Sequence, residues 1–189
     1  MRIIGGAARG LHLSPVGDGD AQAHLRPTSD RVRESIFNLL INGGYGNPVA
    51  GARALDIFAG TGALGLEALS RGAAQATFIE NGAIASALLK RNITLMRAED
   101  RSVLLRRDAT KPGPNPGAAF DLIFLDPPYG KGLGLAALLA CKSWFTPAAL
   151  IVWEENAPAT PPPGFDPLDQ RKYGDTYITL LRAPELAGE

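Results

Sequence analysis

The segment Asp126-Pro127-Pro128-Tyr129 follows the apolar run 120–125 and combines two hydrogen-bond acceptors, a rigid backbone and an aromatic ring. The Asp126 carboxylate and the Pro127 carbonyl can each accept an N–H hydrogen bond from an amino group. These acceptors orient the nitrogen lone pair and favour the positive charge that develops on alkylation. Two prolines stiffen the loop, and Tyr129 offers a face for stacking a flipped base. The segment predicts methyl transfer from a sulfonium to an exocyclic amine of a base.

A glycine-rich turn, with Gly60, Gly62 and Gly65 in a G-x-G-x-x-G pattern, lies between a predicted strand and a predicted helix. Glycines in this context let the backbone pass close to a nucleotide. Glu80 closes the next apolar run, where a carboxylate can accept hydrogen bonds from both ribose hydroxyls. These features alone fit NAD and S-adenosylmethionine equally well.

Two further carboxylates favour S-adenosylmethionine. Asp56 ends the strand before the glycine turn, and Asp108 follows the third apolar run. A carboxylate beside a pyrophosphate would be repelled, whereas S-adenosylmethionine carries an ammonium and a sulfonium. We expect Asp56 near the methionine part of the cofactor, Glu80 at the ribose and Asp108 near the adenine amine.

Alternation of apolar runs with amphipathic stretches places these residues on one sheet edge. The expected strands cover 54–58, 76–80, 102–107, 120–126, 149–155 and 176–183, and the last expected helix covers 133–144. An earlier helix begins at Thr28 or Ser29 and ends at Gly43-Gly44. This βαβ rhythm predicts an α/β fold with a doubly wound, mostly parallel sheet. Such sheets bind ligands at the carboxyl ends of their strands.

Composition sets broad limits on the protein. With 189 residues, of which 46% are hydrophobic, we expect a single domain covering 1–189, in which 1–25 form an N-terminal hairpin and linker. The 19 Lys and Arg balance the 19 Asp and Glu, so overall charge gives no support to nucleic-acid binding. No apolar run reaches the roughly 20 residues that span a bilayer. We expect a cytoplasmic monomer with no membrane contact.

The single cysteine, Cys141, falls inside a predicted helix. Methylation at a ring carbon of cytosine needs a thiolate nucleophile in the substrate pocket. We therefore expect Cys141 to be a small buried side chain, and the reaction to be direct displacement at nitrogen without a covalent intermediate or a metal ion.

The chain resembles the RsmD family of bacterial 16S ribosomal RNA guanine-N2 methyltransferases over nearly its whole length. The resemblance rests on MRIIGGAARG, LRPTSDRVRESIFNLL, LDIFAGTGALGLEALSRGA, FDLIFLDPPYG and RKYGDTYITLL. It implies a Rossmann-like S-adenosylmethionine-dependent methyltransferase with a seven-stranded sheet and an N-terminal hairpin extension. It also implies that 126–129 is the catalytic loop, that Asp56, Gly60, Gly62, Glu80 and Asp108 contact the cofactor, and that the substrate is one guanine of the 16S rRNA in a largely assembled small subunit.

The N-terminal arginines are the candidate RNA contacts: Arg2, Arg9, Arg26, Arg31 and Arg33. Acidic residues nearby leave this region almost neutral, so the arrangement of the arginines carries the prediction. Arg26, Thr28 and Arg33 could instead close over the cofactor carboxylate, and Arg31 could pair with Asp30 or Glu34. DNA adenine or protein glutamine as substrate, and a nicotinamide-dependent oxidoreductase, are the alternative functions.

Overall fold

The computed structural model of the protein describes residues 1–14 and 29–185. Its centre is a seven-stranded sheet with the order β3-β2-β1-β4-β5-β7-β6. All neighbouring pairs from β3 to β5 are parallel, and β7 runs antiparallel to β5 and β6. The strands are β1 (Arg53–Ile57), β2 (Gln75–Ile79), β3 (Ser102–Leu105), β4 (Phe120–Leu125), β5 (Phe145–Glu155), β6 (Asp166–Tyr173) and β7 (Thr176–Arg182). The predicted doubly wound α/β fold is confirmed.

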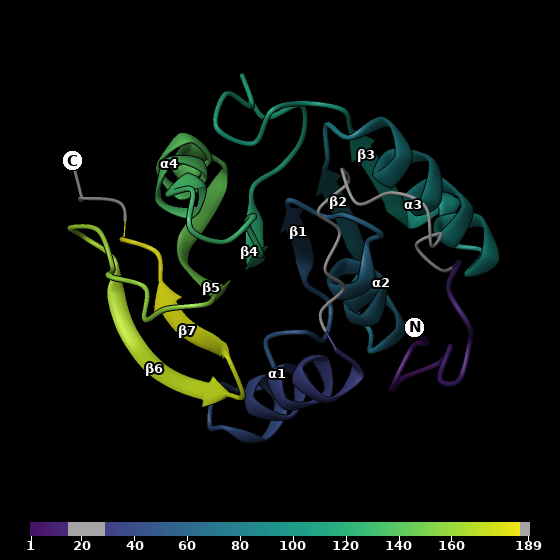
Figure 1. Cartoon of the computed structure of the whole chain (residues 1–189), viewed down its shortest axis with the longest axis horizontal. Coiled ribbons are helices and arrows are strands. Elements are labelled where there is room, and N and C mark those ends of the chain that lie inside the picture. The colour runs from purple at the N-terminus through teal and green to yellow at the C-terminus, as the bar shows by residue number, and fades with distance from the viewer. Residues whose placement is uncertain (15–28, 186–189) are drawn as a thin grey trace.

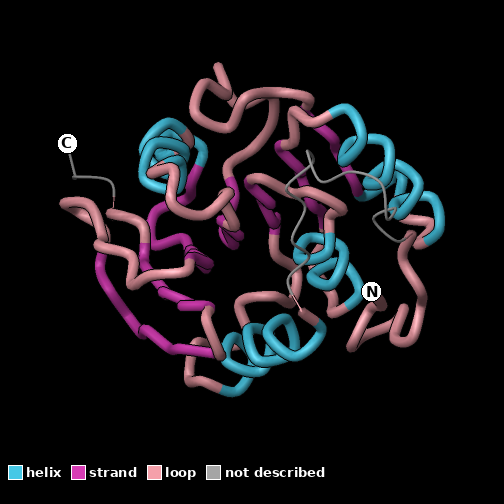
Figure 2. Tube along the Cα trace, viewed as in Figure 1, coloured by secondary structure: helices cyan, strands magenta, loops and turns pink. Residues whose placement is uncertain are grey.

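Helices lie on both sides of the strands (Figure 2). The α-helices are α1 (Asp30–Asn42), α2 (Ala63–Ser70), α3 (Ala83–Leu95) and α4 (Leu133–Ala140). Side chains of α1, α2 and α3 share one buried apolar cluster with alternate residues of the central strands, such as Phe78 and Phe124. The intervening residues, such as Ile57 and Leu125, pack in a second cluster with α4. No helix among the described residues is long and apolar enough to cross a membrane.

Helix α1 begins and ends where its sequence signals predict. The Val32 amide donates to the Ser29 hydroxyl over 3.2 Å, which satisfies one amide of the first turn, and Gly43 caps the C-terminal end. The buried side chains of α1 include Ile36, Phe37 and Leu40, so its apolar face packs on the sheet.

The strand order reverses between β1 and β4, because β2 and β3 lie on one side of β1 and β4 lies on the other. Ile57 pairs with Ile79 on β2 and with Leu125 on β4, and Leu125 pairs with Trp153 on β5. The residues that follow these positions therefore meet at one carboxyl edge. In open α/β sheets, ligands bind at this edge beside the reversal point.

The first thirteen residues form the predicted hairpin, which has one antiparallel bridge and no full strands. Arg2 and His12 make an antiparallel bridge, and the Ile3 amide donates to the Leu11 carbonyl over 2.9 Å. Figure 1 shows this N-terminal segment beside α2 and α3. The linker part of the predicted extension, from residue 15 onward, lies outside the described residues.

One strand was not expected, and one boundary of each of two further elements differs from the expected position by four residues. Strand β6, with the sequence DPLDQRKY, was not predicted as a strand because it has no apolar run, and it is a mostly exposed edge strand. Strand β5 begins at Phe145, four residues before the apolar run 149–155, because its start pairs with Phe120 beside a register shift. Helix α4 ends at Ala140, and a 3₁₀ turn at Lys142–Trp144 completes the segment.

Candidate active site

The glycine-rich turn after β1 has backbone in the left-handed region, which glycine adopts without strain. Gly60 and Gly62 have φ values of 56° and 82°, and Phe58 has a φ of 62° although it carries a side chain. A Cβ on Gly62 would lie 2.2 Å from Leu89 Cδ1, so only glycine fits between the turn and α3. The backbone of the turn at the carboxyl end of β1 therefore carries no side chain at Gly60 and Gly62.

Glu80, directly after β2, holds this turn in place. Its Oε2 accepts a hydrogen bond of 2.9 Å from the Gly60 amide, and its Oε1 accepts one of 2.6 Å from the Gly82 amide at the start of α3. Each carboxylate oxygen has a second lone pair, so Glu80 can still accept ligand hydroxyl groups. Its contact with a ribose stays a prediction.

Asp56 lies beneath the turn rather than in the open. Only 2% of Asp56 is exposed, and its Oδ2 accepts a hydrogen bond of 2.9 Å from the Gly65 amide in the first turn of α2. Burial raises the pKa of Asp56 to about 8, and the charge of Glu80 adds to this effect. The carboxyl group is therefore mostly protonated at neutral pH, and an approaching cation would favour its ionised form. Contact between Asp56 and a cofactor ammonium stays a prediction.

Asp108 follows β3 and lies at the same edge of the sheet in an exposed position. Its Oδ1 accepts hydrogen bonds from the Thr110 hydroxyl (2.7 Å) and the Thr110 amide (2.8 Å). These two bonds hold the pKa of Asp108 below its usual range. An ionised acceptor is thus available for an adenine amino group, a contact that also stays a prediction.

The loop 126–129 runs beside the end of β1. The Asp126 amide donates to the Ile57 carbonyl over 3.3 Å, which joins the loop to the residue that precedes the glycine turn by three positions. Pro127 is buried, whereas Asp126 and Tyr129 are partly exposed. The structure therefore brings the two predicted chemical segments together at the point where the strand order reverses.

Glu154 is a residue of this site that the sequence reasoning missed. It lies near the end of β5 and is 4% exposed, and its Oε1 accepts a hydrogen bond of 3.0 Å from the Tyr129 hydroxyl. Burial and the charge of Glu154 raise the pKa of Tyr129, and a hydrogen bond from Thr176 partly opposes them. The available signal was a glutamate that closes an apolar strand at the carboxyl edge.

The N-terminal arginines fall into two groups. Arg2, Arg9 and Arg31 are exposed, although Arg2 Nε lies 3.5 Å from Asp30 Oδ2. Arg33 is fully buried, with Nη2 at 2.9 Å from Asp30 Oδ1 and Nε at 3.5 Å from Glu67 Oε2. A guanidinium with no exposed surface cannot reach a phosphate, so the prediction that Arg33 contacts RNA is wrong for this structure. Arg26 and Thr28 lie outside the described residues.

Glu67, on α2, is a second residue that the sequence reasoning missed, and it fastens the hairpin to the domain. It is fully buried and accepts hydrogen bonds of 2.8 Å from the Ile4 and Gly5 amides and one of 2.7 Å from Arg71. With Arg33 it forms a buried ion-pair network under the N-terminal segment. The motif GGAARG is thus partly a docking element, because Gly6 leaves no room for a Cβ against the Ser70 carbonyl.

Asn92, on α3, connects the hairpin to the glycine turn. Its Oδ1 accepts a hydrogen bond of 2.7 Å from the Ser14 amide, and its Nδ2 donates one of 3.0 Å to the Thr61 carbonyl. Asn92 is fully buried, so both bonds are shielded from water. The end of the hairpin and the glycine turn therefore share one support.

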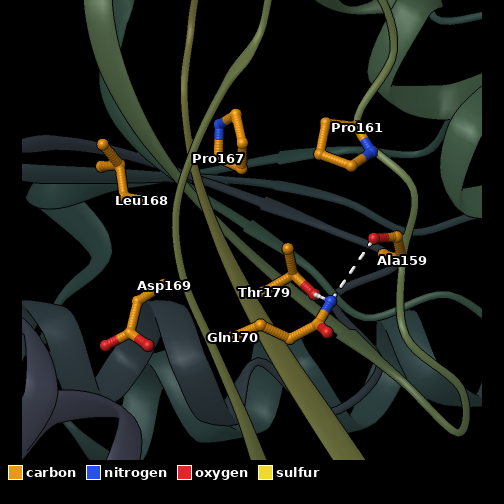
Figure 3. A pocket seen from close by; sticks show the side chains of 7 residues that line it. All are labelled: Ala159, Pro161, Pro167, Leu168, Asp169, Gln170 and Thr179. Atoms are coloured by element: carbon orange, nitrogen blue, oxygen red, sulfur yellow. Dashed lines mark hydrogen bonds between the residues drawn. The ribbon is translucent and has the colours of Figure 1, made fainter.

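A shallow cleft of about 280 Å³ lies elsewhere, against β6 and β7 (Figure 3). Gln170 crosses it and donates to the Ala159 carbonyl and the Thr179 hydroxyl. The lining residues are Ala159, Pro161, Pro167, Leu168, Asp169, Gln170 and Thr179. None of the predicted site residues lines this cleft, so it is separate from the candidate active site.

Cys141 is a buried side chain, as predicted. It caps the C-terminal end of α4 with no exposed surface, and burial raises the pKa of its thiol to about 12. Burial and the raised pKa both disfavour the thiolate form at neutral pH, as expected of a cysteine with a packing role.

The strand order, the glycine turn after β1 and the Asp-Pro-Pro-Tyr loop after β4 define a Rossmann-like S-adenosylmethionine-dependent methyltransferase fold. The fold is also that of TrmN from Thermus thermophilus, with a TM-score of 0.68 at 23% identity over 87% of this chain and 51% of that one. The chain belongs to the RsmD family: the family described as Conserved hypothetical protein 95 matches residues 1–182.

Individual relatives agree with this assignment over more than nine tenths of their length. The chain is 39% identical over 194 residues to Ribosomal RNA small subunit methyltransferase D of Escherichia coli (strain K12), covering 100% of this chain and 92% of the relative. The protein of the same name from Haemophilus influenzae is 35% identical over 96% of this chain and 93% of its own length. The solved structure of yhhF from Escherichia coli has a TM-score of 0.82 at 34% identity, covering 98% of this chain and 99% of that one.

Proposed function

We propose that this protein methylates the exocyclic N2 of a guanine in the 16S rRNA of the small ribosomal subunit, with S-adenosylmethionine as methyl donor. The observation that carries the proposal is the hydrogen bond from Asp126 to Ile57, which fixes the acceptor loop beside the glycine turn. The relatives named as small-subunit rRNA methyltransferases support the choice of RNA as substrate.

The described residues fit the cofactor. The turn at Gly60 and Gly62 has left-handed backbone and carries no side chain of its own at these two positions, so a ligand can approach its backbone closely. Glu80 offers free lone pairs for ribose hydroxyls, and Asp108 offers an ionised acceptor for the adenine amine. When bound, S-adenosylmethionine supplies an electrophilic methyl group on a positively charged sulfur. We include Thr28 among the cofactor contacts, with its position outside the described residues.

The loop residues would prepare the guanine nitrogen. Asp126 and the Pro127 carbonyl accept its two N–H bonds, which holds the nitrogen lone pair away from the ring and favours the charge that develops on the nitrogen. Tyr129 stacks on the flipped base and keeps its plane fixed. Pro128 stiffens the loop, so the acceptors need no reorganisation during the reaction. The methylated nitrogen then releases one proton to solvent.

Three exposed arginines, Arg2, Arg9 and Arg31, are the proposed contacts to the RNA backbone. Arg26 is a further proposed contact outside the described residues. We propose that the whole chain, residues 1–189, acts as one methyltransferase domain and as a monomer, with residues 1–25 as its N-terminal extension.

The direct test is transfer of labelled methyl groups from S-adenosylmethionine to small ribosomal subunits that lack the modification, followed by nucleoside analysis. Recovery of N2-methylguanosine supports the proposal. Label on adenine, or on a protein glutamine, would retain the amino-group chemistry and overturn the substrate.

Replacement of Asp126 tests its role in the reaction. We expect Asp126→Ala to bind S-adenosylhomocysteine within about threefold of the unchanged protein and to lose turnover by about a hundredfold or more, because its acceptor is used mainly in the transition state. Calorimetric titration and single-turnover methyl transfer measure the two effects. A matching loss of cofactor affinity would instead assign Asp126 to cofactor binding.

A further inference from the structure

The ring of Tyr129 is held at both ends. Its backbone follows two prolines in a loop whose first amide is bonded to β1. Its hydroxyl donates to Glu154 Oε1 over 3.0 Å. Strands β4 and β5 are adjacent and parallel, and Leu125 pairs with Trp153. Asp126 and Glu154, which directly follow these two residues, therefore lie side by side at the same edge of the sheet. The contact joins the catalytic loop to the rigid end of a central strand.

Burial of the Glu154 carboxylate costs free energy of hydration, which a hydrogen bond must offset. A carboxylate that is 4% exposed loses most of its hydration, and buried polar groups are tolerated only when they are hydrogen-bonded. Stacking on a base needs only an aromatic face, which phenylalanine would supply equally well. The hydroxyl of Tyr129 and the carboxylate of Glu154 therefore require a shared explanation.

We propose that Glu154 is a positioning residue: by accepting the Tyr129 hydroxyl hydrogen bond, it fixes the plane of the ring on which the target base stacks. This inference rests on the proposed function, because a fixed ring plane is useful only to an enzyme that stacks a base. Thr176, at the start of β7, contacts the same hydroxyl and completes the support from a neighbouring strand.

The role of an acceptor differs measurably from the role of a charge. Glutamine keeps a carbonyl oxygen at the same position, so we expect Glu154→Gln to retain kcat within about threefold. Glu154→Ala removes the acceptor, and we expect kcat for methyl transfer to fall by about tenfold or more with the KM for S-adenosylmethionine almost unchanged. Glu155→Gln, the same substitution one residue further along β5, is the matched control and is expected to leave kcat within about twofold.

A double-mutant cycle tests whether Glu154 acts through Tyr129. We expect Tyr129→Phe to lower kcat as Glu154→Ala does, and the double variant to be no worse than Tyr129→Phe alone, because both substitutions remove one contact. Additive losses would overturn the inference, as would a Glu154→Gln variant as impaired as Glu154→Ala, since the charge would then act independently of the ring.

A spectroscopic measurement separates this inference from the proposed function. The chain has four tyrosines, so Tyr129→Phe identifies the ring signals of Tyr129 in protein with carbon-13-labelled tyrosine. We expect these signals to change in width in Glu154→Ala, where the ring loses its anchor, and to keep the width of the unchanged protein in Glu154→Gln, where the anchor remains. Unchanged ring signals in Glu154→Ala would overturn the inference whatever the activity. Absence of guanine methylation by the unchanged protein would overturn the proposed function and leave the ring measurement valid.

Discussion

Asp56 is a titratable residue that supports the glycine turn, since its carboxyl group accepts the Gly65 amide beneath that turn. Its pKa is about 8 in the folded protein against an ordinary value of 3.8, so the folded state holds the proton more tightly than the unfolded state. Its contribution to stability is therefore fully present below pH 3.8 and is lost as the pH rises to about 8.

We expect Asp56→Asn to remove this dependence, because asparagine keeps an oxygen for the Gly65 amide and does not titrate. The unfolding free energy of the variant minus that of the unchanged protein should increase as the pH rises from 5 to 8, by at most about 1.4 kcal/mol per pH unit. Urea unfolding of both proteins at several pH values measures the difference. Parallel stability curves would contradict a raised pKa at Asp56.

Gly62 is limited both by its backbone and by its neighbour. Alanine at this position would be strained at a φ of 82° and would lie 2.2 Å from Leu89 Cδ1. We expect Gly62→Ala to lower the free energy of unfolding by about 2–4 kcal/mol and to weaken S-adenosylhomocysteine binding. Gly44→Ala is the control, because Gly44 has a φ of 90° and open space around it. Equal destabilisation of the two variants would show that the Leu89 contact contributes nothing.

At the scale of elements, the hairpin is fastened to α2 by buried polar side chains, among which Glu67 carries the charge. Glu67 accepts the Ile4 and Gly5 amides and the Arg71 guanidinium, so its removal leaves these three donors without this acceptor and takes from the buried Arg33 one of its two carboxylate neighbours. We expect Glu67→Ala to cost about 3–5 kcal/mol of unfolding free energy. Faster hydrogen exchange at the Ile4 and Gly5 amides would locate the loss in the hairpin. Glu99→Ala, at an exposed position, should change stability by less than about 0.5 kcal/mol.

The elements that the sequence predicts well are those whose signal is local. Continuous apolar runs mark β1, β2, β4 and most of β5, because both faces of these strands are buried. Strand β6 has no such run, because most of its side chains are exposed. Its extended conformation is held by hydrogen bonds to β7 and not by burial of apolar side chains. Arg33 was misassigned for a related reason: its buried partner Glu67 is distant in sequence, and only the folded chain brings the two together.

At the scale of the whole molecule, the site is built from the ends of neighbouring strands rather than from one motif. Glu80, Asp126 and Glu154 each follow or close a different strand, and the register places them at one edge. A sequence with a clear βαβ rhythm predicts this meeting, because parallel strands present their carboxyl ends together. The contact between Tyr129 and Glu154 was not predictable, since it depends on how the loop after β4 folds back toward β5.

The balanced charge of the whole chain bears on whether the protein would bind free RNA or an assembled ribosomal particle. With 19 basic and 19 acidic residues, and with Arg33 buried, the protein has no net positive charge to attract naked RNA. Affinity for an RNA backbone grows with the number of neutralised phosphates, so binding to free RNA should be weak and should have a shallow dependence on salt. Contacts to an assembled particle would have to supply the remaining affinity.

We therefore expect kcat/KM for methyl transfer to protein-free 16S RNA to be lower than that for small ribosomal subunits by about tenfold or more at physiological salt. The measurement is a comparison of initial rates on the two substrates at equal concentration of target guanine, with S-adenosylhomocysteine affinity as the control for intact enzyme. Equal rates would refute the requirement for an assembled particle, because the RNA alone would then carry every contact that the enzyme needs.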